Sequence, residues 1–206
     1  MEMKNIKLTL GYAIRIYSGG CLGSFDSLCR LFSSDIHIIH ENMNFNIKSP
    51  YKIAEQLGVR FDTFEYSFSK DSEVEFIISG LDEEYATSIL RKALSASSRD
   101  LTEIWNEVYK NKINAGEYIG SEVTIVNKLG LHARASARLC RLTHKFDAEV
   151  ILKRGEQLVS SKDIMEIMML AASLGTKINI IALGAHKKSA FDTIKYLIDD
   201  KLGEAE

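Results

Sequence analysis

The residues best suited to chemistry lie in Gly130–Arg134, which reads Gly-Leu-His-Ala-Arg. Gly130 can close a tight turn after a strand, and a helix is predicted to begin directly afterwards, at His132. Backbone N–H groups of a first helical turn have no partner within the helix, so they form an anion site with the positive end of the helix dipole. That field favours a neutral, nucleophilic imidazole, and Arg134 can bring a guanidinium to the anion. The pattern is typical of a histidine that accepts a phosphoryl group.

A simpler interpretation is that His132 only caps the helix and that Arg134 lies on a solvated face. A histidine that stands alone near a helix start favours this simpler interpretation. Here the whole string follows a predicted strand and precedes a predicted helix, which is the context that the phosphoryl chemistry requires. We therefore assign His132 as the phosphoryl acceptor and Ala133 and Arg134 as the residues that bind the phosphate.

Other reactive residues form no comparable pattern. Cys21, Cys29 and Cys140 contain no Cys-x-x-Cys pair and no cluster at zinc spacing, so no metal site is expected. The glycines around Cys21 lack the strand, helix and downstream acid of a nucleotide fingerprint. We expect no cofactor.

The composition of the 206 residues is ordinary for a globular protein, with 46% hydrophobic and 26% charged residues. A formal net charge of −2 argues against a general nucleic-acid binder, which needs a clustered basic surface. The first ten residues alternate charged and apolar side chains, unlike a signal peptide, and no apolar run approaches the roughly 20 residues of a membrane span. We expect a cytoplasmic protein without membrane insertion.

Residues 121–206 predict alternating strands and helices. The strands are expected at 123–126, 149–152, 157–159 and 177–183, and the helices at 132–144, 162–172 and 187–202. Ser161 is the expected N-cap of the middle helix. The order β-α-β-β-α-β-α predicts an α+β fold, with one antiparallel sheet and the helices on a single face.

Residues 1–97 show a similar order when they are slid along the chain by 111 positions. Leu28 then falls on Leu139 and Ile53 on Ile164. The first copy carries about seven extra residues within 59–72, an insertion that a surface connection tolerates. We predict a duplicated domain, joined to residues 121–206 by a helical linker at 98–120 in which Trp105 packs against one domain. The alternative is that two unrelated halves coincide by chance.

With these motifs, residues 121–206 resemble HPr, the histidine-containing phosphocarrier family of the bacterial sugar phosphotransferase system. Gly130–Arg134 matches the active-site motif of that family, and Lys162–Met168 matches its docking helix. The resemblance implies an open-faced β-sandwich, with the first half as a degenerate second copy. It also implies that enzyme I charges His132 at Nδ1 from phosphoenolpyruvate, and that an enzyme IIA-type protein accepts the phosphoryl group.

The partner-docking surface combines a predicted apolar helix with a basic rim. Five of the six residues at 164–169 are apolar, more than one helix face can bury, so some are expected to stay exposed. Methionines suit a surface that binds successive partners weakly. The expected docking residues are Arg138, Arg141, Ile164, Met165 and Met168.

Two residues of the second half depart from the family pattern. Ala135 stands where proline is usual, which loosens the early turn without removing a chemical group. Asp163 stands where many members carry a serine that a regulatory kinase phosphorylates. It is either a permanent imitation of the phosphorylated serine or an acid favoured near a helix start.

The first half departs further. At the offset of 111, Cys21 and Gly23 replace His132 and Arg134, so the phosphohistidine pair is missing. A buried structural thiol explains Cys21 more simply than a phosphocysteine. This copy is then kept for contact, homodimerisation or regulation. The alternative to a carrier is a regulatory protein that uses the fold to dock partners, with phosphorylation as a signal only.

Overall fold

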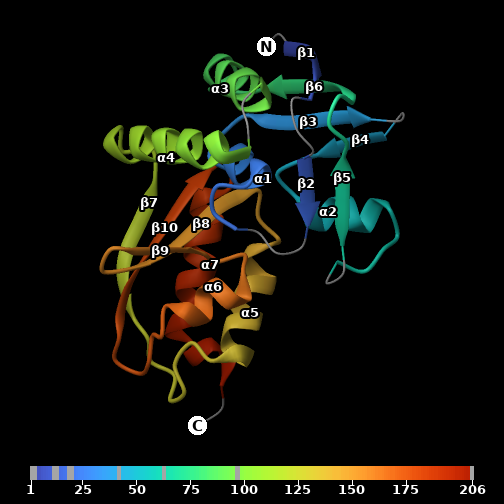
Figure 1. Ribbon diagram of the computed structural model, residues 1–206. Coiled ribbons are helices and arrows are strands. Elements are labelled where there is room, and N and C mark those ends of the chain that lie inside the picture. The colour runs from blue at the N-terminus through green and yellow to red at the C-terminus, as the bar shows by residue number, and fades with distance from the viewer. Residues whose placement is uncertain are drawn as a thin grey trace.

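The computed structural model describes residues 4–10, 14–17, 21–40, 43–61, 64–95 and 98–204. The chain forms two four-stranded antiparallel sheets, a two-stranded ribbon and the helices that cover them (Figure 1). Within these ranges, no helix combines the length and the apolar character that crossing a membrane would require.

The C-terminal half has the predicted order of elements. They are β7 (Ile119–Thr124), α5 (Ala133–Thr143), β8 (Ala148–Arg154), β9 (Gln157–Ser160), α6 (Ile164–Met169), β10 (Lys177–Gly184) and α7 (Lys187–Asp199). The sheet order is β7-β10-β8-β9, and α5, α6 and α7 pack on one face of it. The first strand begins earlier than expected and the middle helix is shorter, but the antiparallel sheet with helices is confirmed.

The N-terminal half repeats this order and adds a ribbon. Its elements are β1 (Lys4–Thr9), β2 (Ile14–Tyr17), α1 (Phe25–Arg30), β3 (Asp35–His40), β4 (Met43–Asn46), α2 (Pro50–Gln56), β5 (Glu65–Phe68), β6 (Glu73–Ser79) and α3 (Glu83–Ser95). The sheet order β1-β6-β3-β4 corresponds strand by strand to that of the other half. The ribbon pairs β2 with β5, and β5 lies inside the segment predicted to be inserted. Helix α4 (Ser98–Asn114) follows, and its Trp105 is buried, as expected.

Two buried lysines show how the halves correspond. Lys48 and Lys162 each precede the short middle helix, and each Nζ donates to two backbone carbonyls at or just after the end of the first helix of its half, at 2.8–2.9 Å. These lysines are 114 positions apart, and the same offset places Ile53 on the buried Ile167. The predicted match of Ile53 with Ile164 is therefore wrong. A short apolar pattern does not fix register, whereas the buried nitrogen of a lysine side chain must find specific hydrogen-bond acceptors.

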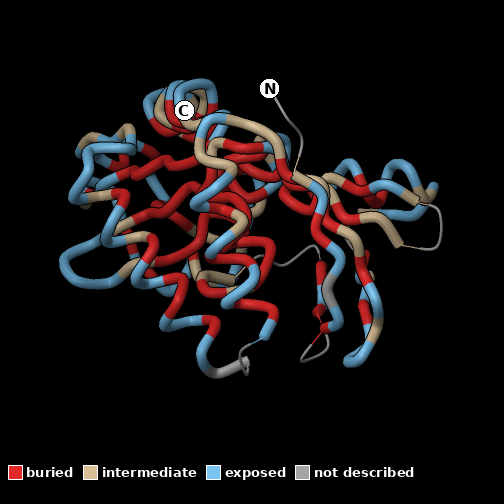
Figure 2. Tube along the Cα trace, turned by 90° about the horizontal axis from the view of Figure 1, so that it is seen from above, coloured by how far each residue is buried: buried red, intermediate tan, exposed pale blue. Residues whose placement is uncertain are grey.

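The second face of the C-terminal sheet is covered, whereas the sequence predicted an open face. Ile151, Ile181 and Leu183 lie on that face and belong to the same apolar core as the N-terminal half. Figure 1 shows α1 between the two four-stranded sheets, and every residue of α1 is buried. In Figure 2 the buried stretches gather in the interior and the exposed stretches lie around its rim.

A buried ion cluster crosses this interface. Arg30 on α1 donates from Nε to Glu149 on β8 and from Nη1 to Asp26, both at 2.6 Å, and the three side chains are at most 2% exposed. Burial alone lowers the pKa of an arginine, but the two carboxylates raise the pKa of Arg30 above its usual value. The guanidinium thus compensates one carboxylate from each half.

Replacing Arg30 should destabilise the protein strongly. Arg30→Met leaves Asp26 and Glu149 buried without their guanidinium partner, which should lower the free energy of unfolding by about 3–5 kcal/mol in urea titrations. Lys92→Ala is the control, because it breaks an exposed pair with Glu107 and should cost no more than about 0.5 kcal/mol. Equal stability of the two variants would contradict this role.

The turn before α5 requires a glycine. Gly130 has φ +65°, and the next residue, Leu131, donates its N–H to the carbonyl of Ala172 at 2.8 Å. A Cβ on Gly130 would lie 2.4 Å from that carbonyl oxygen and 2.7 Å from Cα of Ser173. The loop before β10 therefore holds this turn in place, and the turn positions the start of α5.

Gly130→Ala should cost more stability than Gly155→Ala. Gly155 also has a positive φ, +58°, but a Cβ there meets nothing within 4 Å, so its variant reports backbone strain alone, about 1–2 kcal/mol. Gly130→Ala adds a steric clash with backbone and should lose a further 1–3 kcal/mol, roughly the cost of overpacking. Urea unfolding measures both, and equal losses would show that the Ala172 contact is unimportant.

Candidate functional site

His132 is the N-cap residue of α5. Its backbone is extended, with φ −78° and ψ 174°, and its carbonyl accepts from the N–H of Ser136 at 2.8 Å. Its side chain makes no capping hydrogen bond, so the imidazole is not occupied in holding the start of the helix. The ring is partly exposed, at 29%, and stands beside the N–H groups that begin the helix.

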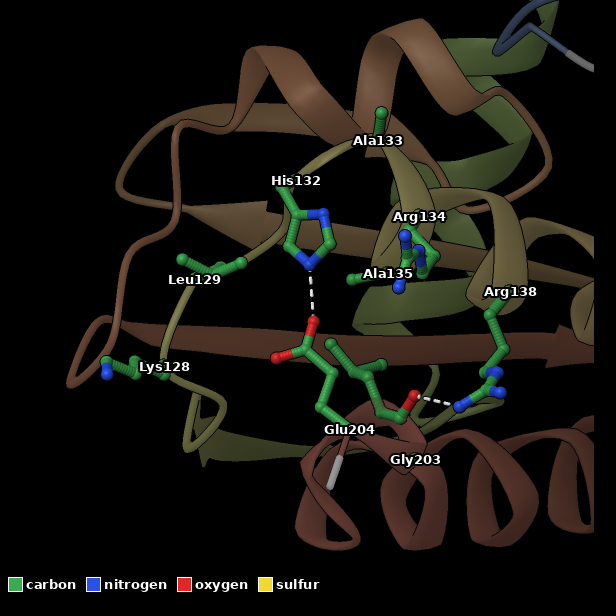
Figure 3. Close-up of a pocket in the computed structure, with 10 residues that line it drawn as sticks. Lys128, Leu129, His132, Ala133, Arg134, Ala135, Arg138, Gly203 and Glu204 are labelled. Carbon is green, nitrogen blue, oxygen red and sulfur yellow. Dashed lines mark hydrogen bonds and ion pairs between the residues drawn. The ribbon is translucent and has the colours of Figure 1, made fainter. Parts of the chain in front are cut away.

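A pocket of about 730 Å³ opens at this ring (Figure 3). Lys128, Leu129 and the first turns of α5 line one side, and the chain segment Leu202–Glu204 lines the other. The predicted residues His132, Ala133 and Arg134 all line this pocket. Ala135, where the family usually has proline, is buried at its base and still lies within a regular helix.

The predicted basic residues have different surroundings. Arg134 is exposed and lines the pocket. Arg138 also lines it, but its Nη1 donates to the carbonyl of Leu202 at 2.5 Å and so binds the C-terminal segment. Arg141 is exposed one helical turn further on, outside the pocket lining. Arg134 is therefore the guanidinium best placed to meet a bound anion.

Sequence reasoning missed Glu204. Its carboxylate pairs with Nε2 of His132 and accepts from Nδ2 of Asn127 at 3.3 Å, while Asn127 also donates to the carbonyl of Gly130 at 2.6 Å. The hydrogen bond from His132, followed by that from Asn127, holds the pKa of Glu204 below its usual value. Glu204 is 72 positions from His132, and no motif joins them. The helix was expected to continue to residue 202, so the turn at residues 201–203 that leads the chain back to His132 was not predicted.

The apolar helix α6 lies beside α5. Ile167 is its buried residue, whereas Ile164 and Met168 are 39% and 37% exposed and Met165 and Met169 are each 67% exposed. The expectation that part of this apolar set remains exposed is confirmed. These side chains form an accessible surface next to the helix that carries His132.

Asp163 caps α6. Its carboxylate accepts from the N–H groups of Met165 at 2.8 Å and Glu166 at 3.0 Å. Ser161, the predicted N-cap, is fully buried two residues earlier, so that prediction is wrong. An ionised acid at this position satisfies two free donors and interacts well with the helix dipole, which is a sufficient reason for its presence.

Cys21 does not occupy a position like that of His132. It is half-buried rather than buried, and α1 begins four residues later, with Ser24 as its N-cap. Gly23 has φ +82°, which prevents the helix from starting earlier. The predicted buried thiol is therefore wrong. The described part of the chain contains no group of three or more His, Cys, Asp or Glu residues suited to a metal ion.

Comparison with known proteins places this geometry in a family. The family model for the phosphorylation site of the HPr component of the phosphotransferase system matches residues 119–200. The phosphocarrier protein HPr of Cupriavidus necator is 42% identical over 85 residues, which make up 41% of this chain and 96% of that protein. The phosphocarrier protein NPr of Shewanella violacea is 40% identical over 84 residues, or 41% of this chain and 92% of that protein.

Among solved structures, HPr of Thermoanaerobacter tengcongensis is 32% identical, with a TM-score of 0.42, and the match covers 43% of this chain and 99% of that one. These proteins match the C-terminal two-fifths of the chain along nearly their whole length. Through this part, which contains His132, the chain belongs to the HPr/NPr family of phosphocarrier proteins.

Proposed function

We propose that His132 accepts a phosphoryl group from phosphorylated enzyme I and passes it to an enzyme IIA-type protein of the cytoplasmic sugar phosphotransferase system. The observation that carries this proposal is the accessible ring of His132 at the N-cap of α5, in a pocket that Arg134 also lines. Membership of the phosphocarrier family supports the same role.

The start of α5 offers the chemistry that a transferred phosphoryl group needs. The free N–H groups of Ala133 and Arg134 can donate to phosphoryl oxygens, and the helix dipole favours the added negative charge. The exposed guanidinium of Arg134 can add a charge-assisted hydrogen bond. Both interactions strengthen as charge spreads over the transferring group, so they favour transfer as well as binding.

Partners would dock on α6 and the neighbouring part of α5. Met165 and Met169 present soft apolar surface that adapts to more than one partner. Arg138 and Arg141 add positive charge at the rim, which would steer acidic partners toward His132. A carrier must release each partner after transfer, and such a modest surface is suited to weak binding.

The first half acts, in this proposal, as a degenerate HPr-like domain at residues 1–97, followed by the helical linker at 98–120. The shared strand order and the corresponding lysines, Lys48 and Lys162, support a common origin. The half-buried Cys21 ahead of α1 supplies no equivalent of the His132 site. This domain then covers the C-terminal sheet and carries no phosphoryl group itself.

Incubation with enzyme I and radiolabelled phosphoenolpyruvate tests the proposal. The chain should acquire an acid-labile phosphoryl group, which His132→Ala abolishes because the nucleophile is gone. Arg134→Ala should slow labelling by roughly tenfold or more, since one charged donor to the phosphoryl oxygens is lost.

Cys21→Ser is the matched control, and it should label like the original chain. The labelled protein should then lose its phosphoryl group to a purified enzyme IIA acceptor. Label that persists in His132→Ala, or a labelled chain that never donates, would rule out the carrier role.

A further inference from the structure

The C-terminal segment has an unusual backbone conformation, and it brings Glu204 to the ring of His132. After α7, the residues Lys201, Leu202 and Gly203 have φ values of +51°, +56° and +67°, a left-handed conformation that L residues rarely adopt in succession. Leu202 is buried at 1% exposure, and Arg138 donates to its carbonyl at 2.5 Å. The chain is therefore turned back on itself and fixed there.

This turn places the carboxylate of Glu204 next to His132. Glu204 lies across the pocket from α5 and faces the imidazole, as Figure 3 shows. One of its oxygens pairs with Nε2 of His132, and the other accepts from Asn127 at 3.3 Å. Because His132 and Asn127 both hold this carboxylate, it offers the ring a hydrogen-bond acceptor at Nε2 and not at Nδ1.

An ionised carboxylate can only accept hydrogen bonds, so Nε2 must carry the hydrogen. In the neutral ring the lone pair is then on Nδ1. Figure 3 shows Nδ1 on the edge of the ring that points away from Glu204, and none of the described residues forms a hydrogen bond with Nδ1. This nitrogen is left open to the pocket side where α5 begins.

We propose that Glu204 is a positioning residue, which holds Nε2–H of His132 and so leaves the lone pair of Nδ1 for the incoming phosphoryl group. This inference rests on the proposed function of His132. It assigns a role to the C-terminal segment, whose left-handed turn brings Glu204 to the ring.

The transfer balances without moving a proton. The lone pair of Nδ1 forms the new N–P bond, and the P–N bond to the donor histidine breaks, with its electron pair returning to the donor nitrogen. Nε2 keeps its hydrogen throughout, and the positive charge that the phosphorylated ring gains lies next to the carboxylate of Glu204. The opposite tautomer would first have to lose a proton from Nδ1.

The test compares Glu204→Ala with the original chain in two measurements. Nitrogen NMR of histidine-labelled full-length protein should find His132 mainly as the Nε2–H tautomer, and the variant should show a mixture of tautomers. Phosphoryl transfer from enzyme I should slow by about tenfold to a hundredfold, as for other histidines that lose an orienting partner.

Asp200→Asn is the matched control, because it removes a carboxylate from the same turn without touching His132, and it should change neither measurement. Circular dichroism checks that all variants remain folded. The inference is overturned if either measurement is unchanged in Glu204→Ala. It is separable from the proposed function, since the tautomer is measured without enzyme I, and the original chain can be phosphorylated even if Glu204 proves irrelevant.

Discussion

A guanidinium without access to solvent holds the two halves of this protein together. Arg30 lies between carboxylates of α1 and β8, and its position fixes how α1 lies on the second sheet. Because a buried charge is costly when it is unpaired, sliding the halves would separate these buried charges from their partners. Separating the halves would expose an apolar sheet face to water. The interface therefore allows one arrangement of the two halves. The face of the C-terminal sheet that was expected to be solvated is buried against the first half.

The site depends on contacts from three parts of the chain. Gly130 lets the turn pass close to the loop at Ala172, α5 supplies free N–H groups and Arg134, and the end of the chain returns Glu204 to the ring. None of these parts would hold an imidazole in a fixed orientation alone. Together they give His132 a helix dipole on one side and a carboxylate on the other, so its two nitrogens become chemically different.

The features that depend on neighbouring residues could be predicted from the sequence. Gly130–Arg134, the apolar spacing in α5 and the order of strands all report on neighbouring residues, and the structure agrees with them. The errors concern interactions between distant residues. Asp163 rather than Ser161 caps α6 because its carboxylate reaches two donors, and Cys21 stands apart from α1 because Gly23 breaks the helix. Glu204 could not be found, since a tertiary turn brings it to His132.

Helix α5 has a different neighbour at each end. His132 stands at its start, near the pocket, whereas His144 caps its end and contacts Phe61 of the first half, with ring centroids 4.7 Å apart. Eleven residues of helix, about 16 Å, separate the two ends. A partner that meets the imidazole therefore approaches the start of α5, while the opposite end of the same helix is covered by its contact with the first half.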